Sequence, residues 1–273
     1  MSSRRASATG GAVTVTAGRN VVVRGCGFAG FPYGVIFDAA KSADVLDCLF
    51  TDALIAGVWM ATGADRTAGS IGIETHRISI QRCRFERGRI GVVDDGGALH
   101  RVSDCAFNLC TDLGVYAAGA EPLLLDGNQF SACTRSLYST SMTYVRRTPC
   151  GQNHLIIRGN FFAPPPGHNA CEFLNGSPVY IESNILSLSS GSFGFAGLAG
   201  CYQVEAIGNV TNGTGTMFDT YEFHGTVSEG GYETQNGRHR IVGTSPPTGD
   251  TWNAGDIVDN RADYYVGALG VGS

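Results

Sequence analysis

A short motif recurs along this chain, and its recurrence limits the fold more than any other feature. Six copies consist of a cysteine or asparagine, one further residue and a phenylalanine, from "CGF" at 26–28 to "NFF" at 160–162. Two further asparagines extend the series of marker residues, which is Cys26, Cys48, Cys83, Cys105, Asn128, Asn160, Asn184 and Asn209. Successive markers are 22, 35, 22, 23, 32, 24 and 25 residues apart. Repeats of this length indicate a solenoid, in which each repeat buries its apolar side chains only by stacking on its neighbours.

Short runs of β-branched and aliphatic residues flank each marker. "NVVV" precedes Cys26 and "HLII" precedes Asn160, and a second run such as "GVIF" at 34–37 follows the marker seven to eleven residues later. The 39 glycines fit many tight turns, and no segment shows the 3.6-residue period of a helix. The sequence therefore predicts an all-β fold, a right-handed parallel β-helix that forms a single-stranded solenoid of about eight coils.

The repeat also predicts the domain organisation. It begins almost at the start of the chain and fades after Thr220. We expect an N-terminal arm at 1–12, the parallel β-helix at 13–220 and a small β module at 221–273.

Stacking explains why the marker changes from cysteine to asparagine partway along. Equivalent residues in adjacent coils lie about 4.8 Å apart. The phenylalanines are expected to fill the core, with the small cysteines packed beside them. An asparagine at the same turn can bond its side chain to the amide of the next coil. We therefore expect a structural role for the four cysteine markers, rather than a catalytic or metal-binding one.

A second column follows from the later strand of each coil and includes Trp59, Tyr116 and Tyr138. Its neighbour one residue earlier is mostly valine, and alignment of the repeats places Glu172 in that valine column. Because side chains alternate between the two faces of a strand, only one of these columns can face the core. Glu172 favours an outward valine column and an inward aromatic column. The alternative is that the aromatic column faces outward as a sugar-binding platform.

Two intervals between markers exceed the repeat, and the extra residues fall at 61–74 and 140–153. Both insertions are expected to leave the solenoid at one corner and to form walls around a floor that carries Asp94 and Asp95. Asp94 shares a strand face with Val92, so the sequence predicts that it points outward. Paired carboxylates beside a groove are what glycoside hydrolysis requires.

The catalytic candidates are therefore Asp94, Asp95 and Glu74. Asp94 can pair with Glu74 or with Asp112, each about one coil away, whereas Glu172 lies three coils or roughly 14 Å away, too far for hydrolysis. "DDGG" at 94–97 is also an ordinary turn sequence, which is the alternative explanation. The candidate substrate contacts are Trp59, Asp112, Tyr144, Arg146 and Arg147.

Composition excludes several kinds of partner. The net charge is −5 and no long basic tract exists, which argues against nucleic acid. No apolar run approaches the roughly 20 residues of a membrane-spanning helix. The N-terminus carries no secretory signal, which predicts synthesis in a cytoplasm. No CxxC pair or cofactor motif is present, so neither a metal nor a cofactor is expected.

Two parts of the chain resemble known families. The segment "GTSPPTGDTWNAGDIVDN" at 243–260 resembles a short C-terminal module of phage tail fibres and tailspikes, and it matches that module at Gly243, Thr244, Pro247, Gly249, Trp252, Gly255, Asp256, Val258 and Asn260. The body, from about Val13 to Thr220, is similar to the pectin-lyase-like β-helices of phage tailspikes, pectate lyases and polysaccharide hydrolases. The N-terminal particle-binding domain and the acidic "GDGxTDD" entry of typical tailspikes are missing.

The resemblance implies a parallel homotrimer that binds host surface polysaccharide and is attached to other virion tail proteins. It also implies a C-terminal module that serves as a trimerisation or receptor-binding tip, and a location on the virion tail after synthesis in the host cytoplasm. The leading hypothesis is a tailspike-like receptor-binding protein that recognises surface polysaccharide. Depolymerisation is left open, with hydrolysis favoured over elimination. The alternatives are a non-enzymatic adhesive or structural spike, and a free, secreted bacterial polysaccharide lyase or epimerase.

Overall fold

The computed structural model of the protein describes residues 11–61, 75–95, 97–117, 120–139, 155–173, 179–197, 204–218, 227–229, 232–235, 238–243 and 257–260. Every regular element in these ranges is a β-strand. The same ranges contain no helix that is long and apolar enough to cross a membrane. The all-β prediction is therefore confirmed.

Most of the strands belong to three parallel sheets. Sheet A has nine strands, β1 (Gly11–Thr16), β4 (Tyr33–Asp38), β7 (Ala56–Ala61), β10 (Ile90–Asp94), β13 (Leu113–Ala117), β16 (Arg135–Ser139), β19 (Cys171–Phe173), β22 (Phe193–Ala196) and β25 (Thr216–Phe218). Sheet B has eight, β2 (Arg19–Arg24), β5 (Lys41–Leu46), β8 (His76–Gln81), β11 (Gly97–Ser103), β14 (Ala120–Asp126), β17 (Leu155–Arg158), β20 (Val179–Glu182) and β23 (Val204–Ile207). Sheet C also has eight, β3 (Gly27–Ala29), β6 (Leu49–Thr51), β9 (Arg84–Glu86), β12 (Ala106–Asn108), β15 (Gln129–Ser131), β18 (Phe161–Ala163), β21 (Ile185–Leu188) and β24 (Val210–Gly213).

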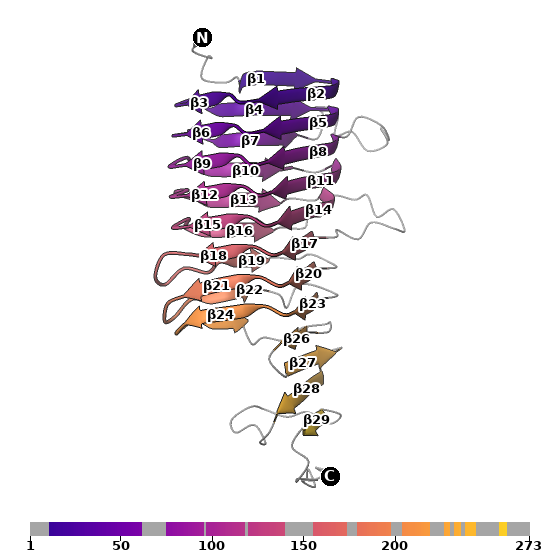
Figure 1. Cartoon of the computed structure of the whole chain (residues 1–273), viewed down its shortest axis with the longest axis vertical. Helices are drawn as coiled ribbons and strands as arrows, with labels where there is room; N and C mark the ends of the chain where they lie inside the picture. Colours follow the sequence, from indigo (N-terminus) through magenta and orange to yellow (C-terminus); the bar gives the residue numbers. More distant parts are fainter. Residues whose placement is uncertain are drawn as a thin grey trace.

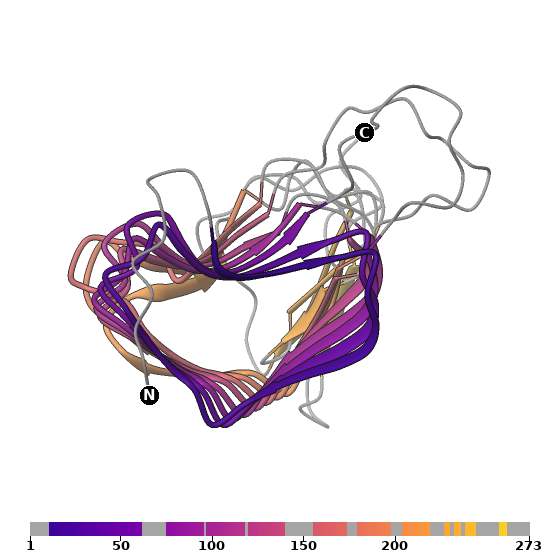
Figure 2. The same cartoon turned by 90° about the horizontal axis from the view of Figure 1, so that it is seen from above.

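The chain visits the sheets in the fixed order A, B, C and then returns to A one coil further along. Each strand pairs in parallel with the strand three places later, as β1 with β4 and β2 with β5. Figure 1 shows the coils stacked along one axis, and Figure 2 shows the three sheets as the sides of a prism. The predicted right-handed parallel β-helix is confirmed, and eight strands in sheets B and C match the expected number of coils.

A separate four-stranded sheet follows the solenoid. It consists of β26 (Val227–Glu229), β27 (Tyr232–Gln235), β28 (Arg238–Gly243) and β29 (Ile257–Asn260). The first two pairings are antiparallel, and β28 pairs with β29 in parallel. The motif that resembles the tail-fibre module starts at the last residue of β28 and ends at the last residue of β29.

The phenylalanines of the repeated motif form one continuous stack inside the solenoid. Neighbouring rings from Phe28 to Phe162 have centroids 4.6–5.1 Å apart and lie within 14° of parallel. Each such pair contributes about 0.5–1.5 kcal/mol beyond the burial of its surface. The stack ends where Leu186 pairs with Phe162 in the next coil.

A column of glycines makes room for these rings. Gly34, Gly57, Gly91 and Gly114 each begin the run that follows the marker, and a Cβ on any of them would lie 2.5–2.7 Å from a phenylalanine ring of the next coil. The same Cβ would lie 2.6–2.8 Å from a backbone carbonyl oxygen of that coil. The recurring glycine is therefore required by space in the core.

The cysteine and asparagine markers use one set of hydrogen-bond positions. The thiols of Cys48, Cys83 and Cys105 face a carbonyl of the preceding coil at 3.5–3.6 Å. The amide nitrogens of Asn128, Asn160, Asn184 and Asn209 donate to the equivalent carbonyls at 2.9–3.0 Å. Each asparagine Oδ1 also accepts the backbone N–H of the preceding marker, starting with the Cys105 N–H at 3.0 Å. The predicted ladder is confirmed across the change from cysteine to asparagine.

The environment of the cysteine markers agrees with a structural role. The hydrogen bond with Cys105 is the largest influence on the Cys83 thiol and, with burial, raises its pKa to about 12. The hydrogen bond with Cys83 and burial also raise the pKa of Cys48 far above its ordinary value. Thiols that stay protonated at neutral pH are poor nucleophiles and poor metal ligands.

The predicted orientation of the aromatic column is wrong. Val35, Val58, Val92 and Val115 are fully buried, whereas the aromatic column one residue later is partly exposed on the outer face of sheet A. The error arises at β19, because Tyr138 pairs with Glu172 and Leu137 pairs with Cys171. Glu172 thus belongs to the aromatic column, and its assignment to the valine column was displaced by one residue. A displacement of one residue exchanges the two faces of a strand, which reversed the inference.

The glycine column gives a direct test of the packing. We expect Gly57→Ala to lower the free energy of unfolding by about 1–3 kcal/mol, because the added methyl group meets the Phe85 ring and the Gly91 carbonyl. Gly27→Ala is the matched control, since no atom lies within 4 Å of the added Cβ and the side chain points to solvent. Its effect should stay within about 0.5 kcal/mol in urea denaturation. Equal losses from the two variants would contradict the packing described above.

Candidate functional site

The outer face of sheet A carries a row of large side chains that we name the outer stripe. Paired strands place its members one above another, and each is partly exposed; they are Ile36, Trp59, Val93, Tyr116, Tyr138 and Glu172. Because these residues stand on paired parallel strands, their backbone spacing is fixed at about 4.8 Å per coil. The outer stripe is thus a line of aromatic and aliphatic groups, with Glu172 at one end, on a rigid support.

The aromatic rings of the outer stripe occur in two stacked pairs. Tyr33, on the same face, stacks on Trp59 with centroids 5.0 Å apart and planes 23° from parallel. Tyr116 stacks on Tyr138 at 6.1 Å and 15°. Val93 lies in the coil between the two pairs. The Trp59 Nε1–H is buried and makes no hydrogen bond within the described part of the chain, so the indole presents its ring surface rather than a donor.

A polar cluster ends the outer stripe beyond Tyr138. The Arg135 guanidinium lies 5.0 Å from the Tyr138 ring centroid, and its Nη1 is 3.0 Å from Glu172 Oε2. The Asn169 side chain donates to Glu172 Oε1 at 3.0 Å and accepts the Phe193 backbone N–H at 3.0 Å. The backbone of β22 thus orients Asn169, which orients Glu172 and Arg135. About a third of each charged side chain stays exposed, so both can still bond a ligand.

Asp94 does not face outward as the sequence predicted. It shares a strand face with Val92, as expected, but this is the inner face, and Asp94 is fully buried. Its Oδ1 lies 3.2 Å from Nδ1 of His100, which is buried as well. A glycan outside the solenoid cannot reach this carboxylate, so Asp94 loses the geometric basis for a catalytic role.

The other predicted residues are divided among several places. Asp95 directly follows β10, is partly exposed, and donates its backbone N–H to the Met60 carbonyl at 3.0 Å. Asp112 directly precedes β13, so it lies at the N-terminal edge of the sheet A strands, whereas Asp95 lies at their C-terminal edge. Asp112 pairs with Arg89 at 3.4 Å. The strand register separates Asp112 from Asp94 by about five residues, on the order of 15 Å, so the two carboxylates cannot act on one bond.

The remaining candidates are Glu74, Tyr144, Arg146 and Arg147, and all four lie outside the described residues. The strands on either side of each insertion show where that insertion leaves the solenoid. The first insertion connects β7 to β8 and the second connects β16 to β17, so both leave sheet A at its junction with sheet B, as predicted. Trp59, the last candidate contact, lies in the outer stripe.

Sequence reasoning missed His100, Arg135 and Asn169. His100 stands in the inward row of sheet B that otherwise holds aliphatic residues such as Leu123, and a polar residue in such a row was the available signal. Arg135 is the first residue of β16, and its contact with Glu172 depends on the register of β19. No spacing pattern along the chain indicates that contact.

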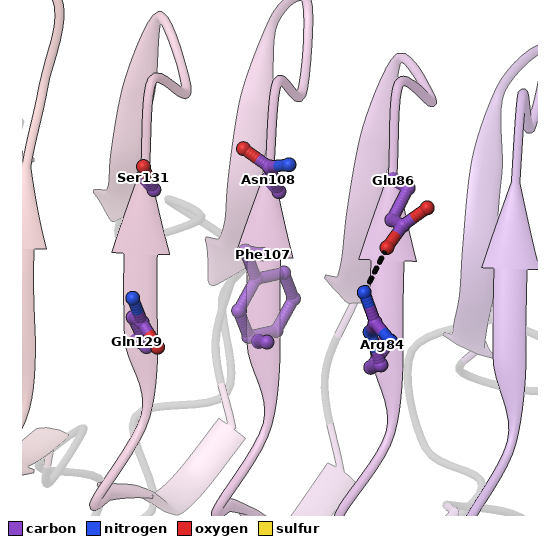
Figure 3. Close-up of a pocket in the computed structure, with 7 residues that line it drawn as sticks. Arg84, Glu86, Phe107, Asn108, Gln129 and Ser131 are labelled. Carbon is purple, nitrogen blue, oxygen red and sulfur yellow. Dashed lines mark hydrogen bonds and ion pairs between the residues drawn. The ribbon is translucent and has the colours of Figure 1, made fainter.

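A second polar surface lies on the outer face of sheet C. Figure 3 shows a shallow hollow there, where Arg84 and Glu86 of β9 stand beside Asn108 of β12 and Gln129 of β15. The hollow contains one ion pair, from Arg84 Nη2 to Glu86 Oε1 at 2.6 Å, and the arginine is largely exposed. Within the described ranges, no three His, Cys, Asp or Glu side chains are placed to hold a metal ion. The outer stripe is therefore the stronger candidate site.

The part of the resemblance that concerns fold is supported by this geometry, because the chain is a parallel β-solenoid. The more specific likeness to tailspikes and pectin lyases has no support from known proteins. No family model matches the chain, and no curated protein matches it.

Proposed function

We propose that the protein binds a surface polysaccharide along sheet A, as a tailspike-like receptor-binding protein does. The observation that supports this most is the outward aromatic column of the outer stripe. From the sequence, an outward column was the alternative that indicated a sugar-binding platform. The valines one residue earlier on each strand face the core, so the aromatic residues cannot form an inward stack.

The chemistry of the outer stripe suits an extended carbohydrate. The tyrosines offer an apolar body for the C–H face of a sugar ring and a hydroxyl for its polar groups, and Trp59 offers an apolar ring face. From Trp59 to Tyr138 the stripe crosses three coil spacings, roughly 14 Å, which accommodates a short run of sugar units parallel to the solenoid axis. The Arg135–Glu172 pair adds donors and acceptors at one end. A rigid sheet holds these groups in place before the ligand binds, which lowers the entropic cost of binding.

Turnover of the glycan is an additional proposal with a narrower basis. Asp95 follows β10 at the junction of sheets A and B, where the first insertion leaves sheet A one coil earlier, and Glu74 immediately precedes the described residue Thr75. A Cβ on Gly97, two residues after Asp95, would overlap the Thr75 carbonyl, so the two backbones are in close contact. Asp95 and Glu74 therefore remain the carboxylate pair to test for hydrolysis. An adhesive spike without turnover is the alternative.

Assembly as a homotrimer on a virion tail is part of the same proposal. It is supported by the resemblance of 243–260 to the tail-fibre module and by the β-strands at both ends of that segment. The four-stranded sheet β26–β29 is the proposed trimerisation or receptor-binding tip.

Binding can be measured through Trp59. The chain has two tryptophans, so Trp252→Phe leaves Trp59 as the single indole reporter. In this background, a panel of purified capsular and lipopolysaccharide glycans should include one that changes the Trp59 emission. We expect Tyr138→Ala to weaken binding of that glycan at least tenfold, or about 1.4 kcal/mol.

Tyr180→Ala is the matched control for that measurement, because Tyr180 is a partly exposed aromatic residue on sheet B. It should leave the affinity unchanged. The proposal fails if no glycan of the panel binds, or if the two tyrosine variants lose affinity equally.

Turnover is tested with the glycan that binds. New reducing ends without absorbance from unsaturated uronate indicate hydrolysis, and absorbance at the ultraviolet band of the uronate indicates elimination. If hydrolysis occurs, Asp95→Asn should reduce its rate by at least a hundredfold while binding is retained. Full hydrolytic activity in this variant would remove Asp95 from the mechanism, and binding without either product would favour the adhesive spike.

A further inference from the structure

A buried network connects four residues at the junction of sheets A and B. Asp94 Oδ1 faces His100 Nδ1 at 3.2 Å, and His100 Nε2 faces the Thr75 carbonyl oxygen at 3.1 Å. The Thr75 hydroxyl donates to the Ala61 carbonyl at 2.5 Å. Thr75, Asp94 and His100 are each at most 1% exposed. The network therefore lies entirely inside the solenoid.

The partners of the imidazole define its protonation. A carbonyl oxygen can only accept, so Nε2 must carry a proton to bond Thr75. Nδ1 faces a carboxylate, and an unprotonated Nδ1 there would place two lone pairs against each other. A proton on each ring nitrogen satisfies both neighbours and makes His100 a cation beside the Asp94 carboxylate; the other arrangement that satisfies them is a neutral ring whose Nδ1 accepts a hydrogen bond from a protonated Asp94. A buried pair of charges is retained only when each charge has its partner in place.

The network also joins both ends of the first insertion. Ala61 is the last residue of β7, and Thr75 directly precedes β8, so the Thr75 hydroxyl bridges the two positions where the solenoid path is interrupted. The Thr75 carbonyl is then held by His100 from the next coil. Gly97 lets β11 approach this carbonyl, since its φ of +126° and the 2.2 Å between an added Cβ and the Thr75 oxygen exclude other residues. A backbone bond from the Asp95 N–H to the Met60 carbonyl, 3.0 Å long, supports the same contact.

We propose that Asp94 and a protonated His100 form a clamp that fixes the base of the first insertion to the following coil, and that loss of the His100 proton releases it. The proposal is independent of the glycan-binding function, because it concerns the solenoid at one end of sheet A. It also gives Asp94 a positioning role in place of the catalytic one.

The surroundings of His100 determine how the clamp depends on pH. Asp94 of β10 is the charged group that acts on the ring among the described residues, and Thr75 contributes its carbonyl. The inward neighbours in adjacent coils, Ile78 and Leu123, are apolar, whereas Lys41 and His76 begin β5 and β8 and are partly exposed.

Two opposing effects act on the proton affinity of the ring. Burial is the largest single influence and lowers the pKa of His100, but the Asp94 charge, its hydrogen bond and the Thr75 carbonyl together raise it above the ordinary 6.5. A raised pKa in the folded state means that the stabilisation is complete below pH 6.5 and is lost as the pH rises through the folded value.

The first measurement is the protonation state of His100 in the full chain. Nitrogen-15 NMR of the histidine side chains, assigned with His100→Leu, should show protons on both ring nitrogens of His100 at pH 6. The signal should change to that of a neutral ring only above the ordinary titration range of histidine. A neutral His100 at pH 6 would overturn the proposal.

The second measurement uses a double variant that copies the next coil. Ala117 and Leu123 occupy the positions of Asp94 and His100 there, so the double variant is Asp94→Ala with His100→Leu. Each single change leaves one buried charge unpaired and should lower the melting temperature more than the double change does. The melting temperature of the native sequence should fall from pH 6 to pH 9, and the double variant should lack this part of the dependence. An identical pH dependence in both proteins would contradict the clamp.

Discussion

The vertical alignment of equivalent side chains is the constraint on which the rest of this structure depends. A coil of about two dozen residues cannot enclose its own apolar side chains, so each residue of the core is buried by its counterparts above and below. The phenylalanine stack supplies the apolar part of this contact, and the marker ladder supplies the polar part. The ladder fixes the register because its bonds form only when markers of adjacent coils are level. A displaced coil would leave buried amide groups without partners, at about 1–3 kcal/mol each.

Fixed register has a consequence for the surface. Once the markers are aligned, every outward position is aligned as well, and single residues become rows with one spacing. The outer stripe is such a row, in which the strand register alone places Trp59, Tyr116 and Tyr138 on one line. The polar cluster of Arg135, Glu172 and Asn169 stands at the end of this line. Insertions can then be added at the junction of sheets A and B without disturbing the row, because the flanking strands return to the same register.

The sequence was sufficient for the fold and insufficient for the site, and the reason is physical. In the six copies each phenylalanine stands two residues after its marker, since both must meet their counterparts in the next coil, so the solenoid and its ladder could be predicted. The orientation of sheet A depended on one alignment in a coil where "APPPGHN" lengthens the turn before β19. In that coil the sequence alignment placed Glu172 one residue away from its true position. Because of this error, the aromatic column was predicted to face inward and Asp94 to face outward. The contacts of His100 with Thr75 and of Arg135 with Glu172 join different coils, and nothing in the local sequence indicates them.

Both the register and the proposed binding surface require the aromatic column of sheet A to face solvent. Hydroxyl-radical footprinting read by mass spectrometry measures this directly, because side chains that water reaches are oxidised and buried ones are protected. Tyr116 and Tyr138 of the outer stripe should be labelled in the native protein, while Phe107 and Phe130 of the core stack should react only after unfolding. Protection of both tyrosines with labelling of both phenylalanines would contradict the register described here and the binding surface that depends on it.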